Sequence, residues 1–160
     1  MPHRIVFLAA MDYIDRKIVG LLAEDARRSL ADIGAAVSLS ASAVNERIRR
    51  LVASGAIKRF TVDADPDILG FPVLAYVFVA LSQQADEGEF RGFVASHPSV
   101  CECHHVTGAW SYLLKVRLPS NGDIEEFLSL LKSRGFLGRS ETIIALSSAV
   151  ERPFSGGVLS

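Results

Sequence analysis

The sequence has only two cysteines among its 160 residues, which excludes a disulfide-rich scaffold. Cys101 and Cys103 are two positions apart, and on an extended strand their Cα atoms would lie about 6.5 Å apart, at the limit of what a disulfide can bridge. We therefore expect two free thiols and a reducing, cytoplasmic location.

Long hydrophobic runs are also absent. The run in RIVFLAAM, which begins at Arg4, contains about seven apolar residues, whereas a membrane-spanning helix needs about 20. No A-x-A-like cleavage site follows it. We expect residues 1–10 to be an extension before the first helix, and no membrane partner. Because Met11 directly precedes that helix, the true translation start stays open.

An excess of one charge is lacking as well, since 17 basic and 18 acidic residues give a net charge of −1. This excludes a protein that is basic throughout, but not one with a basic region. Residues 27–59 contain seven Lys or Arg and only two Asp or Glu, whereas residues 64–160 contain seven and eleven. The apolar share of 49% is typical of a folded protein, and the length fits one large or two small domains.

Three helices are predicted in the basic half. Asp12, Ser29 and Ser40 are suitable N-caps, and Asp32 suits the positive end of the second helix. Gly55 is expected to end the third helix, and residues 57–62 are expected to form a short strand. The apolar residues that follow the caps with helical spacing are Ile14, Ile18, Leu21 and Leu22, then Leu30, Ile33, Ala36 and Val37, then Val44, Ile48 and Leu51.

The second and third helices, joined by about three residues, predict a helix-turn-helix, whose second helix enters the major groove of DNA. At about 100° per residue, the third helix buries one narrow apolar stripe. A solvated surface helix would also have a charged outer face, but the short preceding helix, the tight turn and the local basic excess favour DNA binding. The side chains expected opposite the stripe are Ser42, Glu46, Arg49 and Arg50, with Asn45 and Arg47 on the flanks.

A boundary rich in Asp, Pro and Gly, DADPDILGFP, separates this region from a different pattern. Strands are predicted over residues 73–81, 100–106, 112–118 and 141–147, and helices over residues 87–96 and 121–132, the second capped by Asn121. The order βαββαβ is ferredoxin-like, with helices on one face of an antiparallel sheet. The other face must be covered, so we expect a dimer through it.

The motif CECHH suggests a metal site at first sight. Strand alternation would place Cys101, Cys103 and His105 on one face, spread over about 13 Å, which is too far for one tetrahedral zinc. Glu102 and His104 would lie on the other face. A site shared across a dimer stays open, but we expect packed thiols, no metal and no cofactor.

The chain resembles the leucine-responsive regulatory protein/AsnC (Lrp/AsnC) family of transcription regulators. The resemblance covers residues 11–152 and includes the LSxSxVxxRIxxL…GxI run, the loop and strand VTGAWSYLLKV, and the last strand SETIIAL. It implies an α+β protein with a winged helix-turn-helix over 11–63, a linker over 64–72, a ferredoxin-like effector and oligomerisation domain over 73–152, and a tail over 153–160. The implied partner is double-stranded DNA, contacted by Ser40, Ser42, Asn45, Glu46, Arg47, Arg49, Arg50, Arg28 and Lys58.

The resemblance also implies an effector pocket between dimers, for an amino acid or related carboxylate, in a dimer or octamer. Ser38 replaces a glycine that is frequent in the family's turn, and Ala109 and Ser111 replace acidic residues of its effector loop. Without those acids an ammonium group loses its partners. The pocket residues implied are Gly108, Ala109, Trp110, Ser111, Tyr112, Thr142 and Ile144.

Three alternatives stay open. The loop is also compatible with a simple β-turn that holds a core Trp and Tyr, and the whole chain with a DNA-architectural regulator that has no effector. A siroheme-decarboxylase-like enzyme would share the two-part architecture, with His104 and His105 as heme contacts, but the chain lacks the His-Cys-Tyr and Arg-rich signatures of those enzymes. We expect no catalytic residues.

Overall fold

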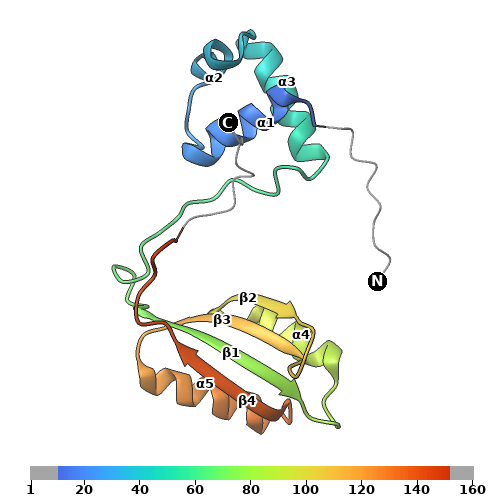
Figure 1. The fold of residues 1–160 in the computed structure, drawn as a ribbon, viewed down its shortest axis with the longest axis vertical. Coiled ribbons are helices and arrows are strands. Elements are labelled where there is room, and N and C mark those ends of the chain that lie inside the picture. Colours follow the sequence, from blue (N-terminus) through green and yellow to red (C-terminus); the bar gives the residue numbers. More distant parts are fainter. Residues whose placement is uncertain (1–10, 152–160) are drawn as a thin grey trace. The chain divides into compact units, whose positions relative to one another are not determined.

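The structure, a computed structural model, describes residues 11–151, so the expected extension over 1–10 and the tail over 153–160 lie outside this part. The chain forms two compact units (Figure 1). The second unit covers Asp63–Ala149, and the first includes the described residues on either side of it. No helix within residues 11–151 is long and apolar enough to cross a bilayer.

The first unit contains three helices, α1 (Tyr13–Glu24), α2 (Leu30–Val37) and α3 (Ala41–Ala53). All three predicted caps are confirmed, because the side chains of Asp12, Ser29 and Ser40 each accept a hydrogen bond from the backbone N–H three residues on. The helices enclose a small core that includes the following buried residues: Ile18, Leu22, Ile33, Val37, Val44 and Leu51.

The predicted strand over residues 57–62 is wrong. After Ser54 and the left-handed Gly55, which ends α3 as expected, this segment makes no strand pairing with the described part of the chain. A strand requires a partner for its backbone N–H and C=O groups. Only Ile57 packs on the core, and Val62 is 84% exposed.

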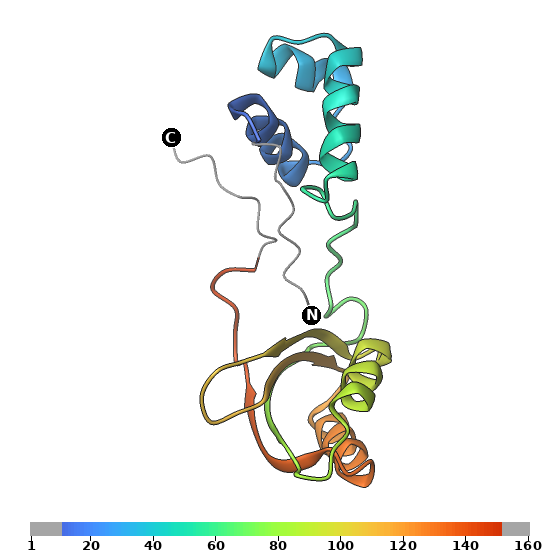
Figure 2. The same cartoon turned by 90° about the vertical axis from the view of Figure 1, so that its right-hand side faces the viewer.

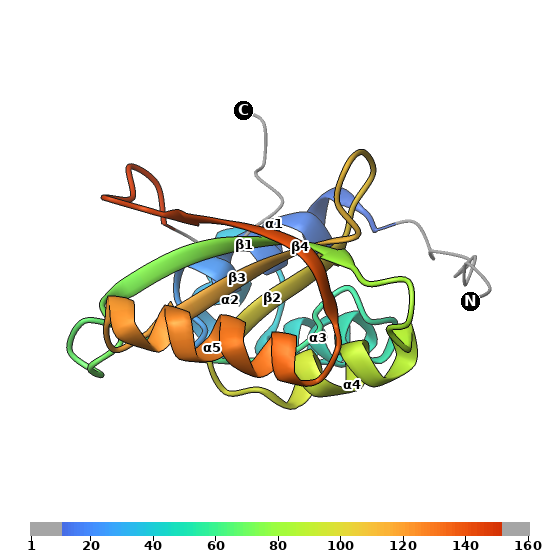
Figure 3. The ribbon, with the colours of Figure 1, turned by 90° about the horizontal axis from the view of Figure 1, so that it is seen from below.

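The second unit confirms the βαββαβ order, with β1 (Val73–Leu81), α4 (Glu87–Ser96), β2 (Val100–His105), β3 (Tyr112–Leu118), α5 (Asn121–Ser133) and β4 (Leu137–Ile144). The strands form one antiparallel sheet in the order β2-β3-β1-β4. Both helices lie on the same side of this sheet, and the β2–β3 loop lies on the opposite side (Figures 2 and 3). Apolar side chains of α4, α5 and one sheet face form the core.

The opposite surface of the sheet, which we call the open face, carries Tyr76, Phe78, Leu113 and Ile143. The register assigns them to it, because Tyr76 pairs with Ile143 and Phe78 pairs with Leu113, and paired residues of neighbouring strands share a face. No helix of the second unit covers this face (Figure 3).

Several predicted boundaries are wrong. β4 covers Leu137–Ile144 rather than 141–147, since its polar first half pairs with β1 through backbone groups, which an apolar pattern does not reveal. β2 ends at His105, one residue before the predicted end of the strand. Asn121 is the first residue of α5 and not its cap: Ser120 holds the extended cap conformation, and its hydroxyl bonds the Asp123 carboxylate instead of a backbone N–H.

The expected alternation in CECHH is also wrong for one residue. The β2–β3 register shifts between Val100 and Glu102, so Cys101 is the extra residue of a bulge and is exposed. Cys103 pairs with Leu114 and His105 with Tyr112 on the helix side. Both thiols are free, as predicted.

Candidate functional site

The turn between α2 and α3 fixes how α3 is presented. Ser38 ends α2 in the left-handed conformation (φ 57°, ψ 44°), the one described residue other than glycine with positive φ. The Leu39 N–H then donates to the Gly34 carbonyl over 2.9 Å. A Cβ on Gly34 would lie 2.4 Å from the Leu39 carbonyl oxygen, so the turn needs glycine at that position. The importance of Gly34 could not be predicted from the sequence, because a glycine inside a helical pattern does not reveal which backbone atom lies next to it.

The predicted exposed face of α3 is confirmed. Val44 and Leu51 are buried. The residues that the structure leaves exposed on this helix include Ser42, Asn45, Glu46, Arg49 and Arg50. Arg49 lies 3.9 Å from Glu46, but the two side chains are 75% and 63% exposed, so this pair holds neither one firmly. The face thus presents a hydroxyl, an amide, a carboxylate and two exposed guanidinium groups to solvent.

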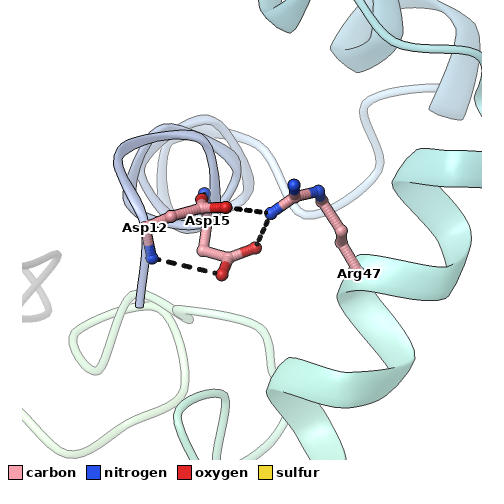
Figure 4. Close-up of polar contacts among 3 residues, drawn as sticks. All are labelled: Asp12, Asp15 and Arg47. Carbon is pink, nitrogen blue, oxygen red and sulfur yellow. Dashed lines mark hydrogen bonds and ion pairs between the residues drawn. The ribbon is translucent and has the colours of Figure 1, made fainter. Parts of the chain in front are cut away.

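The Arg47 side chain is not part of this exposed face but extends from α3 toward Asp12 and Asp15, as Figure 4 shows. Its guanidinium donates to the carboxylates of Asp12 over 2.6 Å and Asp15 over 2.7 Å, at the start of α1. Asp12 and Asp15 also form the reciprocal capping box of α1. Arg47 is 21% exposed and is paired with two carboxylates at the start of α1, so it joins α3 to α1.

These pairs change the ionisation of both partners. A hydrogen bond from the Asp15 backbone N–H, followed by the one from Arg47, lowers the pKa of Asp12 below its ordinary value of 3.8. The bonds to Asp12 and Asp15 raise the pKa of Arg47. Since the folded-state pKa of Asp12 is depressed, its contribution to stability is present above pH 3.8 and is lost as the pH falls through the lower folded value.

We therefore expect Arg47→Ala to lower the Tm more than Arg49→Ala at pH 7, because only Arg47 makes contacts between helices. The difference in Tm between the variants should persist down to about pH 4 and narrow below it, where Asp12 becomes protonated. Thermal unfolding of both variants between pH 3 and pH 7 measures it. Equal Tm values at pH 7 would contradict a joining role for Arg47.

The remaining candidates for DNA contact lie outside the exposed face of α3. Ser40 caps α3 through the Ala43 N–H over 3.2 Å, and its hydroxyl lies 3.1 Å from that of Ser42. Arg28, in the loop between α1 and α2, bonds Glu24 at the end of α1 over 3.2 Å, with 30% of its side chain exposed. Lys58 is exposed in the segment after α3.

The second candidate site is the loop of residues 106–111 between β2 and β3. Gly108 has a φ of 103°, a conformation that favours glycine. Trp110 packs against Phe78 of the open face, with ring centroids 5.8 Å apart. Ser111 fixes the loop to β1, because its N–H donates to the Val79 carbonyl and its hydroxyl accepts from the Leu81 N–H.

The structure does not bring the whole predicted pocket together. Tyr112 is 2% exposed on the helix side, where its hydroxyl bonds Glu87 and Arg91. Thr142 pairs with Val77 and Ile144 with Ala75, so both lie on that same side. Trp110 lies instead against the open face. Alternation along β3 and β4 therefore separates Tyr112, Thr142 and Ile144 from the loop residues within one chain.

Known proteins share both parts of this arrangement. Residues 11–52 match the AsnC-type helix-turn-helix domain, and residues 74–153 match the Lrp/AsnC ligand binding domain. The HTH-type transcriptional regulator FL11 of Pyrococcus horikoshii is 32% identical over 88% of this chain and 93% of its own. The structure of Bacillus subtilis LrpC is 29% identical, with a TM-score of 0.81 over 88% of this chain and 98% of LrpC.

A third protein shares the fold at lower identity. The transcriptional regulator NMB0573 of Neisseria meningitidis, solved as an L-Met complex, is 23% identical and has a TM-score of 0.83 over 88% of this chain and 93% of its own.

Proposed function

Because the chain belongs to the Lrp/AsnC family of transcriptional regulators, we propose that the exposed face of α3 reads DNA in a sequence-specific manner and that a small carboxylate bound at the 106–111 loop modulates it. The protein is a transcriptional regulator with a helix-turn-helix and a ligand-binding domain, and it is not an enzyme. The observation that carries the proposal is the polar face of α3, presented by a turn that only glycine at position 34 permits.

The side chains divide by their chemistry. Ser42, Asn45 and Glu46 lie in the first half of α3, the part of a recognition helix that reaches base edges, and their hydroxyl, amide and carboxylate groups suit such contacts. Arg49 and Arg50 suit guanine or phosphate. We assign contacts with the phosphate backbone to Ser40, Arg28 and Lys58. Arg47 instead fixes α3 to the start of α1 through Asp12 and Asp15.

A second copy of the chain is the proposed cover of the open face. Ile143 is 49% exposed there, beside the half-buried Tyr76 and Phe78, and an apolar patch of this kind on a sheet face favours association. Two copies related by a two-fold axis would present two α3 helices to the two halves of a near-palindromic site.

Light scattering is expected to give at least twice the chain mass of 17.3 kDa. Ile143→Glu places a charge in the proposed interface and should shift the protein to monomer, since a buried unpaired carboxylate is costly. Leu130→Glu is the matched control, because Leu130 is also partly exposed (37%) but lies on α5, away from the open face. A parent protein that runs as a monomer would refute the interface.

The loop is the proposed effector site. The N–H groups of a turn that contains Gly108 can receive a carboxylate, and Trp110 offers an apolar surface beside them. Ala109 and Ser111 provide no acid for an ammonium group, so we propose a carboxylate with an apolar or aromatic body. The L-Met bound to the Neisseria meningitidis fold neighbour makes methionine the first amino acid to titrate.

Trp110 is the one tryptophan of the chain, so its emission reports on this loop. Methionine and simple aromatic carboxylates are expected to shift that emission with a Kd near millimolar, about −4 kcal/mol, and to change DNA affinity. Gly108→Asp, which strains a left-handed position and adds a negative charge, should abolish the shift. A ligand that changes DNA affinity but shifts the emission equally in parent and variant binds elsewhere.

A second candidate function, a DNA-architectural regulator without an effector, is favoured by the same absence of acids at Ala109 and Ser111. It predicts that DNA affinity is unchanged by every amino acid and carboxylate titrated.

A further inference from the structure

Arg139, a residue of β4 outside the implied pocket, contacts the loop directly. We propose that Arg139 determines ligand specificity at the loop by pairing with the carboxylate of the effector. This inference rests on the proposed effector site and names the group that recognises the ligand's charge.

A bulge in β4 directs Arg139 to the loop. The β1–β4 register shifts after the Ala80–Arg139 pair, so that Leu81 pairs with Leu137 and Gly138 is the extra residue. A Cβ on Gly138 would lie 3.1 Å from the Leu81 carbonyl oxygen and 3.2 Å from the Ser82 Cα, which makes glycine the best fit there. Bulges re-aim the neighbouring side chains, and here Arg139 extends over Trp110.

The contacts of Arg139 hold its guanidinium at the loop but occupy only part of its hydrogen-bonding capacity. The guanidinium carbon lies 4.3 Å from the centre of the Trp110 ring, and one terminal nitrogen donates to the Ala109 carbonyl over 3.2 Å. A guanidinium has five N–H donors, so this single bond leaves donors for a carboxylate. The side chain is exposed at this position.

The charge balance around the loop favours an anion. Residues 106–111 contain no Asp or Glu, and the positively charged Arg139 contacts this loop. Glu141 is two positions further along β4 and pairs with Phe78 on the same face. A guanidinium that is stacked on an aromatic ring keeps its planar fork oriented for a two-pronged bond to a carboxylate. A ligand with a neutral amide in place of the carboxylate has the same shape but lacks the negative charge that pairs with the guanidinium.

A matched pair of probes, 3-phenylpropanoate and 3-phenylpropanamide, tests the inference in the full chain, with Trp110 emission and titration calorimetry as readouts. The parent should bind the carboxylate at least tenfold more tightly than the amide. Arg139→Gln should remove that preference and leave amide binding within about twofold, and Arg139→Lys should restore part of it. Arg134→Gln is the control, because Arg134 also lies over an aromatic ring, that of Phe93 at 4.7 Å, and should keep the preference.

Each other outcome is decisive. If Arg139→Gln weakens both probes equally, Arg139 only fastens the loop and the inference is wrong. If the parent binds both probes equally, Arg139 does not determine ligand specificity. The same holds if the preference for the carboxylate persists in Arg139→Gln. Neither outcome contradicts the proposed effector site. If neither probe binds the parent, the proposed carboxylate site fails together with this inference.

Discussion

Gly34→Ala is expected to destabilise the helix-turn-helix by about 2 kcal/mol. The new Cβ would lie 2.4 Å from the Leu39 carbonyl oxygen, a backbone atom that cannot move without opening the turn. Overpacking costs about 1–3 kcal/mol, and a contact of 2.4 Å with a backbone atom belongs at the upper end of that range. The better helix propensity of alanine returns only about 1 kcal/mol. Denaturant unfolding of the full chain, followed by far-UV circular dichroism, measures the loss.

Ser38→Gly provides the matched control four residues away. Because Ser38 is exposed and holds a φ of 57°, glycine should relieve strain there and stabilise the same turn by about 0.5–1 kcal/mol. Opposite signs for the two substitutions support the turn geometry. A Gly34→Ala protein as stable as the parent would show that the turn adopts a different path.

The double substitution Arg49→Ala/Arg50→Ala is expected to lower the affinity for a selected duplex about 100-fold. Both side chains are exposed on α3, and a specific arginine–guanine contact contributes about 1–3 kcal/mol. Gel-shift titrations of each single variant at several salt concentrations separate their roles. The arginine that reads a base should lose discrimination at one position of the site, and the one that contacts phosphate should reduce the salt slope by about 1.

Arg134→Ala, in the second unit, is the control for this experiment and should bind DNA as the parent does. Parent-like affinity of the Arg49→Ala/Arg50→Ala protein would mean that the outer face of α3 is only a solvated surface.

Local chemistry was sufficient to predict most of the fold. Asp12, Ser29 and Ser40 cap their helices with their own side chains, and the apolar spacing of α3 identified its buried and exposed faces. These features depend on neighbours three or four residues away, which the sequence displays. The predicted strand over 57–62 is wrong because a strand depends on a distant partner. The first half of β4 was not predicted because Arg139 and Ser140 join the sheet through their backbone.

The sites were harder to predict for the same reason. The ion pairs of Arg47 could not be predicted, because its partners, Asp12 and Asp15, are more than 30 residues away in the sequence. Tyr112 is close to Trp110 in the sequence, but strand alternation turns it into the core. Arg139 carried no local signal, since its contacts with Ala109 and Trp110 follow from the β1–β4 register and the bulge at Gly138.

The measurement that tests the central claim most directly is site-directed DNA cleavage. The two native cysteines, Cys101 and Cys103, are first replaced. A single cysteine is then introduced in place of Ala41, an exposed residue of the first turn of α3. This cysteine is labelled with an iron chelate that cuts nearby DNA. The same label at Gly92, an exposed residue of α4, is the control. If α3 enters the major groove, the label at position 41 should cut a selected duplex at two clusters about one helical turn apart, or a multiple of it, and the label at position 92 should not. A stable complex in which both labels cut alike would contradict the account.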